Sequence, residues 1–388
     1  MFRFICKTLL EQRRSVDLNV NCVRYLQTLT SLNSISRSPP DERSLTVSYL
    51  KNSCGLSLEE AISASNVVNI KNTQKPNSVI QLLKSHGFTN SQIASFISKY
   101  PRILLAEPEK NLKPKIEYFK SVGILGLDLP KFLCSNKQIL LCSLKNQIIP
   151  TFDFLKGFVQ TNENLLFALK NSSRVISCNI EKLMVPNIKT LRAHGVPEPL
   201  IARLIMLQPQ SLILRADLFD NVVDVVKEMG FQPTSGSFIL AIRSMSVMSK
   251  ATWESKKEIL ISFGWSEDEF VLAFKRQPIL MLSSAKKIRK LMDFYVNEVG
   301  LKPQDIIRYP HLLLVSMEQR IFPRWSVLKV LKSKNLLEKD INVVRALIVC
   351  KKEFEKKFVT RYVDGCPDVI KAYQSRVDVQ DVVRDCET

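Results

Sequence analysis

The chain has 388 residues, and its 56 lysine and arginine residues outnumber 37 acidic residues, for a formal net charge of +19. Hydrophobic residues make up 45% of the chain, which excludes a largely disordered protein. Only 11 residues are glycine, which argues against a glycine-loop nucleotide-binding protein and favours helices. The length suits two ordinary domains or one elongated array of repeats.

The excess of positive charge belongs to the body of the chain. Residues 1–40 hold six of the basic residues and two of the acidic ones, so most of the excess lies beyond them. A body this basic favours a polyanionic partner, and nucleic acid is the leading candidate. The alternative is a basic protein that its charge keeps soluble.

Residues 1–40 have the composition of an organelle transit peptide. Phe2, Leu9 and Leu10 alternate with basic residues such as Arg13 and Arg14 in a potential amphipathic helix, and the segment is rich in serine and threonine. We expect this segment to be cleaved or disordered and to direct the protein to the mitochondrion, with the chloroplast as the alternative. An N-terminus without any targeting role is also compatible with the composition.

The body of the chain repeats with a period of about 36 residues. The first landmark is a proline, or a residue in its place, followed by an apolar cluster. These landmarks are Pro101, Lys137, Ser173, Pro209, Met245, Pro278 and Pro310. A second proline recurs at the same step, at Pro114, Pro150 and Pro186.

A glycine followed by an apolar residue marks the other boundary of each repeat. These glycines are Gly55, Gly87, Gly123, Gly195, Gly230, Gly264 and Gly300. Capping boxes that begin at Ser57, Thr89 and Ser266 predict helix starts just after three of them. After Gly230 and Gly300, Pro233 and Pro303 are predicted to lie in the first turn of a helix.

One repeat therefore predicts two helices. The first runs over Thr89 to Tyr100, with Ile93, Phe96 and Ile97 on its buried face, and ends at the landmark proline. A short buried connection leads to a second helix over Asn111 to Val122, and the next glycine ends it in a left-handed turn. Where Lys137, Ser173 or Met245 replaces the proline, we expect the first helix to end less sharply.

About eight such units fit between Ser48 and Leu337, and the segment Asp340 to Tyr373 resembles a capping end. A single unit cannot bury both faces of its helices, so neighbouring units must stack. The predicted fold class is all-α, a curved superhelical solenoid. The predicted domains are the leader (1–40), the repeat solenoid with its C-terminal cap (45–373) and a disordered tail (374–388).

This alternation of glycine turn, capped helix, proline with apolar triplet and second helix resembles the mitochondrial transcription termination factor (mTERF) family. The segment 45–57 is similar to the first repeat of its plant organellar branch, and the resemblance covers Leu45 to Tyr373. It implies mTERF-type repeats in a bent solenoid that binds nucleic acid through a positive face. It also implies a role in organelle transcription, including termination, or in RNA maturation such as intron splicing.

The sequence contains no motif for catalysis, a cofactor or a metal. Neither phosphate-binding glycine motif is present, only three histidines occur, and the nine cysteines include no C-x-x-C pair. We therefore expect no enzyme activity and reduced cysteines that mostly fill the core. No apolar run approaches the roughly 18 residues of a membrane span, and we expect a monomer without membrane contact.

The candidate nucleic-acid contacts are the basic residues that are densest in the later repeats. They are Arg243, Lys250, Lys256, Lys257, Lys275, Arg276, Lys286, Lys287, Arg289, Arg308, Arg320, Arg324 and Lys329. Arg243, Arg276 and Arg308 are favoured because each lies near the end of a first helix and arginine offers a planar fork to phosphate. Any one of these residues could instead be an ordinary solvated side chain. Aromatic residues are too sparse here to favour base stacking over backbone contact with a duplex or a structured RNA.

Two functions of different classes remain open at this point. The first is an organellar protein that binds double-stranded DNA or structured RNA and regulates gene expression, with organellar transcription or splicing proteins as further partners. The second is an α-solenoid scaffold for proteins in an organellar ribonucleoprotein or transcription complex. An RNA reader of the pentatricopeptide type is disfavoured, because no paired polar code positions recur and each unit contains the internal proline.

Overall fold

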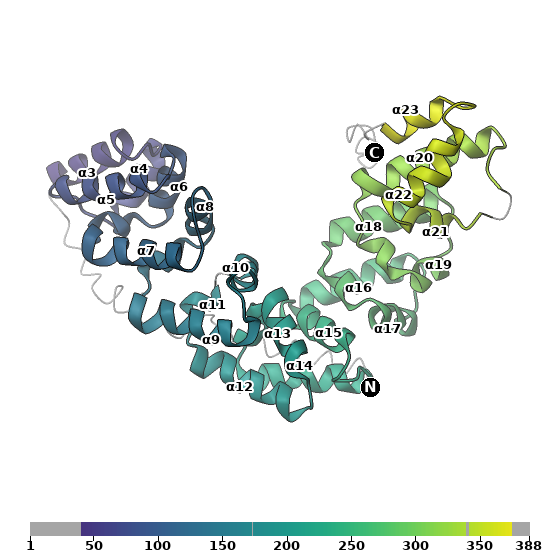
Figure 1. Cartoon of the computed structure of the whole chain (residues 1–388), viewed down its shortest axis with the longest axis horizontal. Coiled ribbons are helices and arrows are strands. Elements are labelled where there is room, and N and C mark those ends of the chain that lie inside the picture. The colour runs from purple at the N-terminus through teal and green to yellow at the C-terminus, as the bar shows by residue number, and fades with distance from the viewer. Residues whose placement is uncertain (1–39, 173, 339–340, 375–388) are drawn as a thin grey trace. The chain divides into compact units, whose positions relative to one another are not determined.

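The computed structural model describes residues 40–172, 174–338 and 341–374, and every regular element in these ranges is a helix. The all-α prediction is confirmed. The predicted leader, apart from Pro40, and the predicted tail, apart from Gln374, lie outside the described residues. The chain forms two compact units, Met1–Val247 and Met248–Thr388. Within each unit the helices pack side by side as pairs (Figure 1).

Each repeat consists of a first helix, a connector and a second helix. The first helices are α4 (Leu58–Ser65), α6 (Asn90–Lys99), α8 (Asp128–Ser135), α10 (Asn162–Asn171), α13 (Glu198–Leu207), α15 (Gly236–Ser246), α17 (Glu267–Arg276), α19 (Pro303–Arg308) and α21 (Val343–Ile348). The connectors are η2 (Pro101–Leu105), η4 (Lys137–Leu141), α11 (Arg174–Ser177), η6 (Pro209–Ile213), η7 (Pro278–Leu282) and η9 (Pro310–Leu313).

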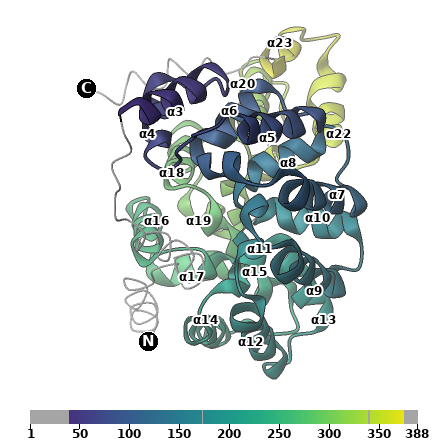
Figure 2. The same ribbon diagram turned by 90° about the vertical axis from the view of Figure 1, so that its left-hand side faces the viewer.

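The second helices follow the connectors. They are α5 (Gln74–Ser85), η3 with α7 (Pro108–Leu112, Lys113–Ser121), η5 with α9 (Leu144–Ile148, Ile149–Val159), α12 (Ile180–Ala193), α14 (Ala216–Glu228), α16 (Lys250–Ser262), α18 with η8 (Ala285–Asp293, Phe294–Glu298), η10 with α20 (Met317–Ile321, Phe322–Ser333) and α22 with η11 (Lys351–Phe354, Glu355–Val359). Helix α3 (Pro40–Asn52) precedes the first repeat, and η12 (Thr360–Tyr362) and α23 (Asp368–Gln374) follow the last. In the second unit, α16 to α19 lie beside one another (Figure 2).

The predicted helix starts are largely confirmed. Ser57, Thr89 and Ser266 each accept a hydrogen bond from the backbone N–H three residues on, and the side chain of that residue bonds the cap's own N–H. Pro303 is the first residue of α19, as predicted. The prediction for Pro233 is wrong, because Ser235 caps α15 and Pro233 lies in the turn before it.

Glycine turns close most of the second helices, as the sequence predicts. Gly195 has φ +78°, and the backbone N–H of Val196 reaches back to the carbonyl of Leu191, so two unpaired helix-end groups are satisfied. Val196 is buried and fixes the corner to the core. After α9, which has no glycine in this place, Gln160 adopts φ +65°.

The predicted buried connection is a 3₁₀-helix in most repeats. Pro101 fixes the first residue of η2, and Ile103 and Leu104 are fully buried there. The expectation of a less sharp helix end is met at Met245, where α15 runs on to Ser246 and no connector helix follows. Ser173 lies outside the described residues. At Lys137 the 3₁₀-helix η4 forms without the proline.

The second helices start earlier than the sequence predicts. The second helix of the repeat that begins with α6 starts at Pro108, and η3, η5 and η10 are single π-turns. Pro114, Pro150 and Pro323 each lie at the second residue of the α-helix that follows such a turn. Proline has no N–H for the helical ladder, and the wider turn before it accommodates the ring.

The core runs through the stack as the predicted faces require. Ile93, Phe96 and Ile97 of α6 are buried. The last helices cover the end of the second unit, where Phe354, Cys366 and other apolar residues pack against α20.

Substitution of Gly195 tests the left-handed turn. No atom lies within 4 Å of a Cβ built at Gly195 or at Gly157, but only Gly195 has a positive φ. We expect Gly195→Ala to lower the free energy of unfolding by about 1 kcal/mol through backbone strain. Gly157→Ala, inside α9, should raise the free energy of unfolding by about 0.5–1 kcal/mol. Urea unfolding monitored by circular dichroism measures both, and equal signs for the two variants would contradict the turn assignment.

Candidate nucleic-acid interface

Each repeat has two distinct edges. The first helix ends and the second helix begins at the connector, and we call this end the connector edge; the opposite end, with the glycine turn, is the glycine edge. Consecutive second helices run in the same direction. Lys75 near the start of α5 pairs with Glu107 just before η3, and His86 at the end of α5 lies 3.5 Å from Glu117 of α7. The connector ends of neighbouring repeats therefore lie together.

Polar side chains on the second helices tie each repeat to the next connector. In the first unit, Nζ of Lys115 donates to the carbonyl of Leu140 at 2.6 Å, and Nδ2 of Asn187 donates to that of Leu212 at 3.0 Å. Nε2 of Gln147 donates to the carbonyls of Ile176 and Cys178. The end of a short helix leaves carbonyls without a partner, and burying them unpaired is costly. We call these side chains the tie residues.

In the second unit most of the tie residues are cationic, whereas Tyr295 is a neutral one whose hydroxyl donates to the carbonyl of Leu312. Nζ of Lys256 donates to the carbonyl of Met281 at 2.7 Å, and Nζ of Lys287 donates to that of Leu314 at 2.6 Å. One nitrogen of Arg324 donates to the carbonyls of Leu347 and Val349.

Arg320 and Arg276 serve the same purpose. Nη2 of Arg320 donates to the carbonyls of Ile348 and Val349, and Nη1 of Arg276 donates to the carbonyl of Ile307 at 3.0 Å.

The structure thus corrects part of the predicted contact surface. Lys256 is 7% exposed and Arg324 is 3% exposed, and the guanidinium of Arg324 lies 4.7 Å from the Phe354 ring centre. Burial lowers the pKa of both side chains. Neither presents its charge at the surface, contrary to the expectation. Lys287 and Arg320 are half-buried, and their charged ends are engaged by carbonyls.

The remaining predicted residues of α15 and α16 are also partly buried or paired with acidic residues. Arg243 is half-buried, its Nε has no hydrogen-bond partner within the described residues, and burial lowers its pKa. Lys257 pairs with Glu254 at 2.7 Å and lies 3.8 Å from Glu267. Lys250, at the start of α16, is half-buried.

Five predicted residues are exposed and have no ion-pair or hydrogen-bond partner for their charged groups within the described residues. They are Lys275, Lys286, Arg289, Arg308 and Lys329. Lys275 and Arg308 lie in the last turns of α17 and α19, and Lys286 lies in the first turn of α18, so these three share the connector edge. Of the three favoured arginines only Arg308 is both exposed and without a partner among the described residues, because Arg243 is half-buried and Arg276 uses one nitrogen to bond the carbonyl of Ile307.

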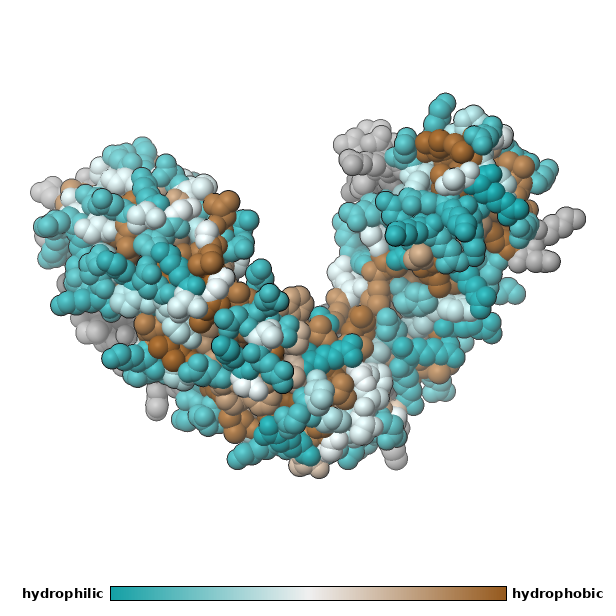
Figure 3. Space-filling view, viewed as in Figure 1, coloured by the Kyte–Doolittle hydropathy of each residue, from teal (hydrophilic) through white to brown (hydrophobic). Residues whose placement is uncertain are grey.

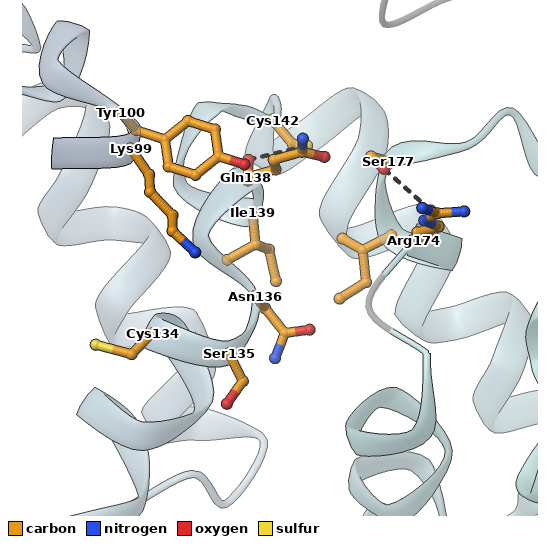
Figure 4. Close-up of a pocket in the computed structure, with 11 residues that line it drawn as sticks. Lys99, Tyr100, Cys134, Ser135, Asn136, Gln138, Ile139, Cys142, Arg174 and Ser177 are labelled. Carbon is orange, nitrogen blue, oxygen red and sulfur yellow. Dashed lines mark hydrogen bonds between the residues drawn. The ribbon is translucent and has the colours of Figure 1, made fainter. Parts of the chain in front are cut away.

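A pocket of about 270 Å³ lies at the connector edge of the first unit (Figure 4). Three successive repeats line it, with Lys99 and Tyr100 from the end of α6, Asn136 from the end of α8 and Arg174 from α11. Oδ1 of Asn136 is buried without a hydrogen-bond partner in the described residues. The pocket therefore combines two cationic side chains with a polar wall.

A family model described as mTERF matches the chain twice, over residues 80–243 and 237–355. Together the two matches cover most of the chain. The chain belongs to the mTERF family. No curated protein matches it significantly. The described mTERF repeats form a helical-repeat solenoid, as the resemblance implied.

These mTERF repeats show no grouping of residues that suggests chemistry. Within the described ranges, no three His, Cys, Asp or Glu side chains are placed to hold a metal ion, and no helix is both long and apolar enough to cross a membrane. His86 and His194 lie at helix ends and contact Glu117 and Lys227, respectively. Trp253 and Trp265 are buried in the core.

Sequence reasoning missed basic residues in the first unit. Lys110, Lys145 and Lys182 lie in the first turns of η3, η5 and α12, all three are exposed, and none has an ion-pair partner in the described part of the chain. The repeat period of the sequence could have identified these lysines, because a basic residue recurs near the start of the second helix from Lys75 onward.

Substitution of a buried tie lysine and of an exposed lysine should change stability by different amounts. Lys256→Met leaves the buried carbonyl of Met281 without a donor, and we expect it to lower the free energy of unfolding by about 1–3 kcal/mol. Lys286→Met removes an exposed lysine without a described partner and should change stability by less than about 0.5 kcal/mol. Urea unfolding compares the two variants. Equal stabilities would show that the tie contributes nothing.

Proposed function

We propose that this protein is a non-enzymatic, nucleic-acid-binding regulator of gene expression in an organelle. Membership of the mTERF family supports the nucleic-acid partner. The observation that carries the proposal is the set of exposed, unpaired cations on α17 to α20, because solvated cations without acidic partners are available to phosphates. We propose double-stranded DNA or structured RNA as the target, since the buried tryptophans offer no platform for stacked bases.

The finer parts of the function rest on the sequence. The composition of residues 1–40 supports import into the mitochondrion, with the chloroplast as the alternative. Transcription termination, another step of transcription, and intron splicing are the candidate outputs. Sequencing the nucleic acid crosslinked to the protein inside its organelle distinguishes them, because binding sites would fall at transcript ends, at promoters or in introns.

A protein-binding scaffold is less well supported. Exposed apolar residues such as Leu127 and Phe167 occur, but on the visible face of each unit apolar residues are interspersed with hydrophilic ones (Figure 3). Scattered apolar side chains are normal on protein surfaces and do not mark a protein interface.

Salt dependence of binding tests the proposal. We expect the full chain to bind duplex DNA or structured RNA with an affinity that falls steeply between 50 and 300 mM salt, because each phosphate contact releases counterions. A variant with Lys275, Lys286 and Arg308 all changed to glutamine should bind more weakly, and its log–log salt slope should be shallower by about two to three. Fluorescence anisotropy measures both quantities. An absence of binding, or an affinity that does not change with salt, contradicts the proposal.

A further inference from the structure

The starts of first and second helices differ in charge in this protein. First helices begin at the glycine edge, and most of those with charged first turns carry acidic residues there, whereas α21 carries Arg345. The acidic residues are Glu59, Glu60, Asp128, Glu163, Glu198, Glu267, Asp268, Glu269 and Asp305. The positive end of the helix dipole favours acids there, so stability alone explains them.

Second helices begin at the connector edge and carry basic residues in or beside their first turns. These are Lys75, Lys110, Lys145, Lys182, Arg215, Lys250, Lys286, Lys287, Lys351 and Lys352. The helix dipole disfavours a cation in this place. Because the same protein follows the rule at most of its charged first-helix starts, the basic second-helix starts need an explanation other than stability.

Acidic residues also occur at the second-helix starts. They pair with other cations, so several of these lysines have no ion-pair partner among the described residues. Glu109, Asp217, Glu318 and Glu353 form ion pairs with Lys113, Arg215, Lys290 and Lys357. Lys110, Lys145, Lys182 and Lys286 have no ion-pair partner among the described residues. We call these four the rung lysines.

The glycine edge gathers the acidic first-helix starts, and several of its cations pair with acidic residues. Nε of Arg192 at the end of α12 lies 2.5 Å from Glu198 at the start of α13, across the glycine turn. Lys257 lies 3.8 Å from Glu267, and Lys120 lies 3.2 Å from Glu117. Positive charge therefore accumulates at the connector edge of each unit, where the last turns of first helices add Lys99, Lys275 and Arg308.

We propose that the connector edge is the surface that contacts the phosphate backbone, with one unpaired rung lysine in a repeat, at Lys110, Lys145 and Lys182 in the first unit and at Lys286 in the second. This inference rests on the proposed function and locates its contact surface. Packed helices lie about 8–10 Å apart, so neighbouring rungs span roughly the rise of three base pairs along a duplex. Contacts of this kind position the protein on the backbone and read no base.

A pair of triple variants with equal charge change tests the edge. The rung variant carries Lys110→Gln, Lys145→Gln and Lys182→Gln. The control variant carries Lys84→Gln, Lys156→Gln and Lys189→Gln, which removes three exposed lysines from the carboxyl-terminal halves of α5, α9 and α12. None of the six has an ion-pair partner among the described residues. Anisotropy titrations of the full chain against duplex DNA and duplex RNA of one sequence, from 50 to 300 mM salt, give affinity and salt slope.

We expect the rung variant to lose at least tenfold in affinity at 150 mM salt and about 2.7 in salt slope on duplex DNA, whereas the control variant should stay within about threefold with a slope change below one. The two duplexes show whether the backbone partner is DNA, RNA or either. Thermal unfolding separates contact from structure, since removing cations from helix starts should leave the midpoint of the rung variant no lower than that of the control. A Lys→Arg triple variant at the rungs should retain binding.

The outcomes separate this inference from the function on which it rests. If the wild-type chain binds and the two glutamine variants lose affinity equally, or the control loses more, the connector edge is not the contact surface. A rung variant with a markedly lower unfolding midpoint than the control would overturn it too, because the rungs would then be structural. If the wild-type chain binds neither duplex at any salt concentration, the proposed function fails as well.

Discussion

The stack of repeats depends on how the buried carbonyls at the connectors are paired. A helix pair closed by a 3₁₀ connector exposes carbonyls at the connector's end, and the preceding repeat would bury them unpaired. Lys115, Asn187 and Lys256 solve this in the same way, each with one side-chain donor placed seven or eight residues after the helix cap. The bond joins a helix to the following repeat, so it stabilises the stack and not a single unit.

The ties separate the basic residues into those that bond buried carbonyls and those whose charge stays exposed. In the second unit most donors are lysine and arginine, whose charged ends are held by carbonyls. In the first unit Lys115 does the same, but Gln147 and Asn187 pair the carbonyls without charge. Net charge therefore overstates the cations available to a ligand. Exposure and pairing, not the density of basic residues along the sequence, identify the cations that a phosphate could reach.

The sequence predicted the repeat and its buried faces because both follow from local rules. Glycine at a positive φ, the capping boxes and the spacing of Ile93, Phe96 and Ile97 depend on a few neighbouring residues. Lys256 and Arg324 are buried because they bond carbonyls 25 and 23 residues away. The periodicity of the sequence does not show which basic side chain turns inward. The π-turns before Pro114 and Pro150 were also not predicted, because a proline in a helical pattern predicts a helix start and not a widened turn.

Helix α14 lies just before the repeat of α15 and α16, which lacks a connector helix, and shows what the ties contribute. At the fourth and eighth positions after its cap, where several other second helices carry donors, α14 has Phe219 and Val223, both buried. The next landmark is Met245, α15 continues to Ser246, and no 3₁₀ connector forms. At this junction the side-chain donors and the 3₁₀ connector are absent together, whereas Arg320 of η10 and Arg324 of α20 donate to the α21–α22 junction, which also has no connector helix. The boundary between the two compact units, Val247 and Met248, falls at this copy, and the two family matches overlap at 237–243 just before it.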